Sequence, residues 1–169
     1  MKTAAILLIV VSGSFLGTNY PKSTNKSLSN SDNCLSITIA EKILGQPARL
    51  TENSVEEKEE ATRYRCTYTA VTKDTVENNK GHLYFLKEQY KTLGYAKKTY
   101  ANMLISNRNS GLRELSNMGD EAFSHTDGKN FYLMIVRKKS EIIRMKVNKL
   151  TSTTSVSELQ KVVAKMANN

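Results

Sequence analysis

The sequence predicts an α+β domain with a single antiparallel β-sheet of about five to six strands, helices packed on one face, and one disulfide bond. Residues 62–71 and 142–147 alternate polar with apolar side chains, which is the pattern of strands that bury one side. Residues 95–107 place apolar side chains at helical spacing along one side only. Because a helix with a single apolar stripe packs through that stripe, the helices are expected to cover one face of the sheet.

The segment 131–147 is expected to form the central hairpin of this sheet. Its first arm is apolar on both sides, as a strand inside a sheet should be. Its second arm alternates, and one side carries the apolar residues Ile143, Met145 and Val147. The other side carries Arg144 and Lys146, so the hairpin should have one dry face toward the helices and one wet, basic face.

Caps, turns and periodicity place the remaining elements. A hydroxyl followed three residues later by a carboxylate predicts helix starts at Thr38 and Ser155, and Gly45 should end the first helix. The acidic stretch 50–60 is expected to be a loop. Further strands are expected at 62–71, 82–88, 112–116 and 121–125, and a helix at 95–107.

The N-terminus predicts export. Residues 1–17 combine a basic start, an apolar run and small residues after it, as a signal peptide does. Residues 18–33 are expected to be a flexible linker, and residues 34–169 a single domain. Cleavage would release a periplasmic or extracellular protein, whereas an uncleaved segment would anchor it. No apolar run reaches about 18 residues, so no transmembrane helix is expected in the mature chain.

The chain has two cysteines, Cys34 and Cys66, both after the signal segment. An even number of cysteines in an exported chain predicts a disulfide bond. The alternative is two free, buried thiols. Neither histidine, His82 or His125, has ligand-like spacing to a cysteine, so no zinc site is expected.

Four short motifs lie between residues 34 and 123: Cys34-Leu35, Leu44-Gly45-Gln46-Pro47, Cys66-Thr67-Tyr68 and Met118-Gly119-Asp120-Glu121-Ala122-Phe123. With the hairpin that follows, they resemble the pattern of small exported bacterial envelope proteins, often lipoproteins, of uncharacterised domain families. The resemblance implies an antiparallel sheet with helices and a disulfide from the first helix to the first strand. It implies no catalytic residue, and this chain lacks the lipid-acceptor cysteine of the lipoproteins.

No catalytic, metal or cofactor site is expected. Asp120 and Glu121 could bind a cation or act as acid and base, but the favoured interpretation is a turn with Gly119 at positive φ and Asp120 bonded to nearby amides. His82 and His125 could form an acid–base pair, but each is close to a predicted turn. No nucleophile elbow or phosphate-binding glycine loop occurs.

Charge is the most informative functional feature. Residues 73–169 contain 17 basic and 9 acidic residues, a surplus of 8. Basic side chains concentrate on the hairpin, and the expected binding residues are Lys138, Lys139, Arg144 and Lys146. Such a stripe would attract an acidic envelope protein, anionic lipid or a cell-wall polymer. Export and the lack of a recognised motif disfavour nucleic acid. The alternative is a lysine-rich surface that only aids solubility.

These features together predict an exported bacterial envelope or secreted protein that acts as a non-catalytic binding module with a basic surface. The alternatives are a small secreted hydrolase or nuclease, and an inhibitor or immunity-type protein. The absence of a catalytic constellation in the sequence favours binding over hydrolysis.

Overall fold

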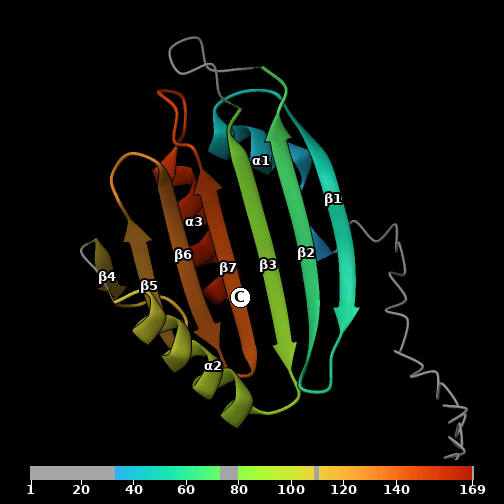
Figure 1. Cartoon of the computed structure of the whole chain (residues 1–169), viewed down its shortest axis with the longest axis vertical. Helices are drawn as coiled ribbons and strands as arrows, with labels where there is room; N and C mark the ends of the chain where they lie inside the picture. The colour runs from blue at the N-terminus through green and yellow to red at the C-terminus, as the bar shows by residue number, and fades with distance from the viewer. Residues whose placement is uncertain (1–32, 73–79, 109–110, 169) are drawn as a thin grey trace, which may run out of the picture.

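The computed structural model describes residues 33–72, 80–108 and 111–168, so the expected signal peptide and nearly all of the linker lie outside the described residues. Seven strands and three helices follow one another in these ranges: α1 (Ile37–Leu44), β1 (Ala48–Glu57), β2 (Ala61–Ala70), β3 (His82–Tyr90), α2 (Leu93–Ser106), β4 (Leu112–Leu115), β5 (Glu121–Thr126), β6 (Phe131–Lys138), β7 (Glu141–Asn148) and α3 (Val156–Asn168). The strands form one antiparallel sheet in the order β1-β2-β3-β7-β6-β5-β4 (Figure 1). The predicted α+β class is confirmed.

The predicted hairpin is the centre of the sheet. β7 is the fourth of the seven strands and pairs with β6 from Phe131↔Asn148 to Lys138↔Glu141. Ile143, Met145 and Val147 are all buried on one side of β7, as the alternation predicts.

The predicted number of five to six strands is wrong, because residues 50–60 are not simply a loop. Most of this stretch belongs to β1, an edge strand that pairs with β2 alone. None of its ten residues is fully buried. An edge strand with one neighbouring strand and two partly solvent-exposed sides does not need alternating apolar residues. The glutamate-rich sequence of β1 therefore gave no indication of a strand.

The face of the sheet toward α1 and α3 is closed by an apolar core. Phe85, Met134 and Met145 project from it and meet Ile43 of α1 and Leu159 of α3, all at most 1% exposed. As predicted, α3 begins with a cap, because the Ser155 hydroxyl accepts the backbone N–H of Glu158. We call this side of the sheet the closed face.

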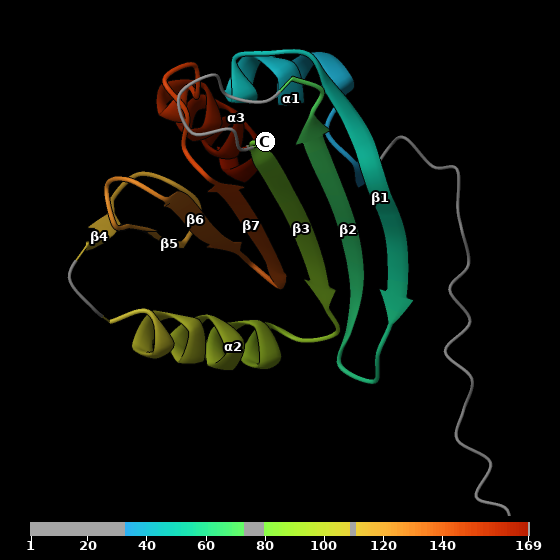
Figure 2. The same ribbon diagram turned by 45° about the horizontal axis from the view of Figure 1, so that its top comes forward.

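The expectation that all helices pack on one face is wrong, because α2 lies across the other face (Figure 2). Its predicted stripe is confirmed: Ala96 and Tyr100 are buried against Phe123, Ile135 and Ile142. In antiparallel register, Ile135 and Ile142 point away from the closed face. We call this second side the α2 face.

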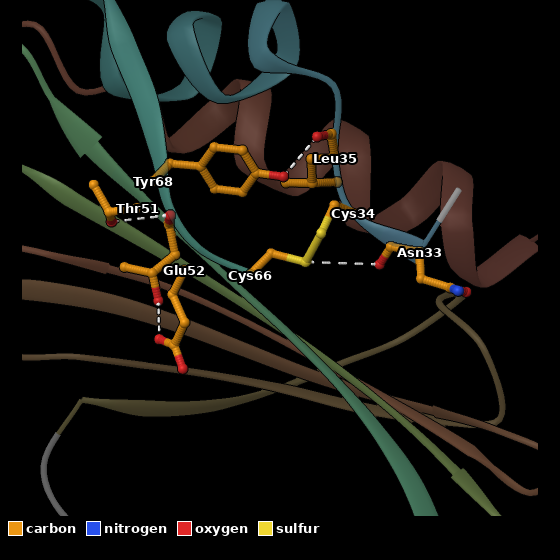
Figure 3. The surroundings of a disulfide bond; sticks show 8 residues. Asn33, Cys34, Leu35, Thr51, Glu52, Cys66 and Tyr68 are labelled. Carbon is orange, nitrogen blue, oxygen red and sulfur yellow. Dashed lines mark hydrogen bonds between the residues drawn. A yellow bond between two sulfur atoms is a disulfide. The ribbon is translucent and has the colours of Figure 1, made fainter. Parts of the chain in front are cut away.

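A disulfide joins Cys34 to Cys66, which confirms the predicted bond (Figure 3). It fastens the segment that leads into α1 to the middle of β2. Beside it, the buried Tyr68 hydroxyl donates a hydrogen bond of 2.6 Å to the backbone oxygen of Leu35, and burial raises the pKa of Tyr68 to about 12.

The α1 cap is Ser36 rather than Thr38. No helix in the described ranges is both long and apolar enough to span a membrane.

Gly45 ends α1 as predicted, and its conformation is required there. Its φ is +67°, in the left-handed region, and its N–H returns to the carbonyl of Glu41. A Cβ at this position would lie 1.9 Å from the carbonyl oxygen of Thr153. Only glycine therefore lets the chain turn from α1 into β1 beneath the segment before α3.

Candidate ligand pocket

A half-open pocket lies between α2 and the sheet, on the α2 face. Its volume is about 280 Å³, just below the range of roughly 300–1,000 Å³ that is typical of small-molecule sites. Its lining is mostly apolar with two basic side chains, and comprises Tyr84, Leu86, Met103, Asn107, Leu133, Ile135, Arg144 and Lys146. Three of the sheet's central strands and one helix therefore build a single concave site.

Strand alternation explains how the sheet side of the pocket arises. Leu83 and Phe85 of β3 are buried in the core of the closed face. Because side chains alternate along a strand, Tyr84 and Leu86 point to the α2 face. The register sets Tyr84 opposite Lys146 and Leu86 opposite Arg144. The same rows continue into β6, so aromatic, aliphatic and basic groups from three strands adjoin one another.

Arg144 is fixed in this pocket by a buried carboxylate. Glu88 is fully buried, and its two oxygens lie 2.8 Å from Arg63 Nε and 3.0 Å from Arg144 Nη2. Neither Nε atom makes an aligned hydrogen bond to a described group, so the cluster is held by ion pairing at close range. Both arginine side chains remain 31% exposed. The carboxylate thus anchors two guanidinium groups whose outer parts meet solvent.

Lys146 lies two residues further along β7 and is held differently. Its Nζ lies 5.0 Å from the centre of the Phe131 ring, a cation–π contact that leaves the ammonium group its hydrogen-bond donors. No carboxylate of the described residues lies within ion-pair distance of this Nζ. Lys146 therefore supplies a positive charge at the pocket that no described acidic group neutralises directly.

Asn107 joins the pocket to His125 of β5. The Asn107 side-chain N–H₂ donates to the Met103 carbonyl, and its Oδ1 lies 3.1 Å from His125 Nδ1. Since an amide oxygen can only accept, His125 donates from Nδ1 in this contact. The His125 ring also packs edge-on against Phe131. This end of the pocket is therefore ordered by polar contacts.

The four residues predicted to bind a polyanion do not form one stripe. Arg144 and Lys146 line the pocket on the α2 face. By alternation Lys138 points to the opposite side, where it borders a depression beside Met166 of α3. Lys139 occupies the β6–β7 turn at positive φ. The expectation that these four side chains form one basic stripe is therefore wrong, and a binding role for all four stays a prediction.

Arg137, which the sequence places in the same basic cluster, has a structural role instead. It is 4% exposed and is clamped by Asp120 and Glu121, whose carboxylates contact Nη1 and Nε. As predicted, Gly119 has positive φ and Asp120 accepts a backbone N–H, from Lys139. That bond, and next the Arg137 guanidinium, hold the pKa of Asp120 below its usual range. These carboxylates stabilise the hairpin turn.

The two histidines do not form an acid–base pair. His82 is on β3 and His125 on β5, with β7 and β6 between them. Three inter-strand spacings put them roughly 14 Å apart. His82 bonds to the Thr69 hydroxyl, and burial followed by the charges of Lys149 and Lys80 lowers its pKa. Within the described ranges, no three His, Cys, Asp or Glu side chains are grouped to hold a metal.

Sequence reasoning found the two cations of the pocket but missed its apolar walls. The sequence predicts the apolar hairpin arm and the helix stripe that carry Leu133, Ile135 and Met103, but nothing in it indicates that these residues border a pocket. The two-sided apolar arm 131–137 was the available indication that both faces of the sheet are covered.

No family model, curated protein or solved structure matches the chain.

Proposed function

We propose that the chain is an exported, non-catalytic binding protein and that its ligand site is the pocket between α2 and the sheet. The observation that carries this proposal is the composition of the pocket: apolar side chains from three elements surround a concave space, and two cations lie at its border. Natural small-molecule sites share this plan, with an apolar lining and a few polar groups that orient the ligand.

Binding is favoured over hydrolysis by the chemistry of the lining. Among the described residues that line the pocket there is no carboxylate, histidine, serine or cysteine. Hydrolysis needs a nucleophile or an activated water beside a general base, and arginine and lysine at this site supply neither in their charged forms. The same residues are suited to hold an anionic group.

Export is supported by the leader-like segment 1–17 and by the disulfide between Cys34 and Cys66. Disulfide bonds persist in oxidising compartments such as the periplasm or the extracellular space.

Lys138 and Lys139, at the hairpin turn, are a second candidate contact with envelope lipid or wall polymer. A vesicle co-sedimentation series at rising salt, wild type against Lys138→Ser with Lys139→Ser, tests that contact separately.

The pocket itself is tested by methyl NMR of the wild-type protein labelled at its methionines. Met103 lines the pocket, whereas Met134 and Met145 are buried in the closed core. Titration with octanol or octanoate should shift the Met103 methyl resonance and leave Met134 and Met145 in place. If neither compound moves Met103, or if both compounds move only methionines outside the pocket, the proposed site is wrong.

A further inference from the structure

We infer that the pocket takes a small amphipathic anion, with its apolar chain or ring beneath α2 and its single anionic head between Arg144 and Lys146. This inference rests on the proposed binding function and adds to it the chemical class of the ligand. It follows from three features of the described residues: the apolar floor, the spacing of the two cations, and the burial of the one nearby carboxylate.

The apolar floor suits a hydrocarbon group. Leu86, Leu133, Ile135 and Met103 supply aliphatic carbons, and Tyr84 adds an aromatic ring that is 38% exposed. The volume of about 280 Å³ is roughly twice that of an engineered cavity of 150 Å³ that holds benzene. A short acyl chain or one substituted ring is therefore the size of group that this floor can cover.

The two cations suit one anionic head. Arg144 and Lys146 are i and i+2 on β7, so they project on the same side roughly 7 Å apart along the strand. A carboxylate or phosphate placed between them can meet both. The pairing of Arg144 with Glu88 holds the guanidinium in position before a ligand arrives, which lowers the entropy lost on binding.

The local charge balance disfavours other heads. Arg144 and Lys146 are the two cations at the pocket, and Glu88 is the carboxylate that pairs with Arg144. Glu88 is shared with Arg63, which also lies 3.9 Å from Glu56. Because Glu88 is fully buried between the arginines, it offers no exposed oxygen to a ligand. A cationic head would meet only like charge at the pocket, whereas an anionic head meets a surplus of positive charge from Arg144 and Lys146.

The test compares three ligands with the same chain and different heads: octanoate, octanol and octylamine. The protein contains no tryptophan, so Tyr84→Trp places a single indole at the pocket. Tyr95→Trp, at a similarly exposed position on α2 outside the lining, is the matched reporter control. Octanoate should bind to the Tyr84→Trp protein about tenfold more tightly than octanol, and octylamine more weakly than both.

Charge variants assign the head to its site. Lys146→Gln should weaken octanoate binding about tenfold and leave octanol binding unchanged. Lys138→Gln, on the other side of the same hairpin, should change neither. If octanoate and octanol bound equally tightly while the Met103 resonance still shifted in the wild type, the inference of an anionic ligand would be wrong. The proposed location of the binding site would still be supported. No Met103 shift with either ligand would overturn both proposals.

Discussion

The closed face of the sheet is sealed by two helices, whereas the α2 face is covered by one helix over part of its area (Figures 1 and 2). Among the described residues, eighteen buried side chains form the core of the closed face and seven form that of the α2 face. The closed face carries the disulfide, and the α2 face carries the Arg63–Glu88–Arg144 cluster and the pocket.

This difference separates stability from binding within one sheet. Burial of apolar area is the main source of folding free energy, and most of it lies on the closed face. Buried charge adds little net stability compared with apolar packing of the same volume. The arginine–glutamate cluster on the α2 face is therefore better explained by the positioning of a charged group than by a contribution to folding.

The largest expected effect is a difference between two neighbouring residues of β3. Phe85 is 1% exposed in the closed core, and Leu86 lies half-buried at the pocket. Phe85→Ala should lower the free energy of unfolding by about 3–5 kcal/mol, because it leaves a cavity among close-packed side chains. Leu86→Ala, at a site already open to water, should cost clearly less. Urea denaturation of both variants measures the difference, and equal losses would contradict the division between the faces.

The next effect concerns the disulfide that closes a loop with a sequence separation of 32 residues. Replacing Cys34 and Cys66 together with alanine should lower the free energy of unfolding by about 3–4 kcal/mol, since the unfolded chain gains freedom. Reduction of the wild type should reproduce most of that loss. Octanoate binding at a temperature where the variant stays folded should not change, because the bond lies on the other face. A large loss of affinity there would couple the two faces.

Strand alternation made most of the sheet predictable. In β2, arginines and threonines alternate with Tyr64, Cys66 and Tyr68, and the structure places the two sets on opposite faces. β1 escaped prediction because an edge strand with two partly wet sides imposes no such pattern on its sequence. Period-2 geometry is therefore informative only where one side of a strand is buried.

The placement of α2 could not follow from its own sequence. Its stripe of Ala96 and Tyr100 shows which side of the helix is buried, but not which face of the sheet receives it. That information lay in β6, where Ile135 and Val136 are both buried although they point to opposite faces. Glu88, which pairs with Arg144, and the lining residues Tyr84 and Met103 all lie outside the hairpin, so the pocket required the tertiary structure.

A moderate effect is expected when the anchor of the charge cluster is changed. Glu88→Gln removes the negative charge between Arg63 and Arg144 and should cost about 2–3 kcal/mol, less than the usual 3–5 for a broken buried pair because both arginines can be hydrated. The same change should weaken octanoate binding, since Arg144 loses the partner that holds its guanidinium in position before the ligand arrives. Glu57→Gln, an exposed control on β1, should alter stability by under about 0.5 kcal/mol. If neither the free energy of unfolding nor the octanoate affinity changed, the cluster would not be what positions Arg144.

The smallest effect concerns Asp120, whose ion pair with Arg137 stabilises the hairpin turn away from the pocket. The pKa of Asp120 is lowered from 3.8, first by the Lys139 backbone N–H and next by Arg137. A carboxyl with a depressed folded-state pKa stabilises the fold above its unfolded pKa, and this contribution is lost as the pH falls through the folded value. Because the Asp120 side chain is 45% exposed, Asp120→Asn should cost under about 1 kcal/mol at neutral pH. Urea midpoints from neutral pH downward should show the wild type and variant converging below about pH 4. Octanoate affinity should stay the same throughout, and a loss at neutral pH would mean that the turn and the pocket are coupled rather than independent parts of the α2 face.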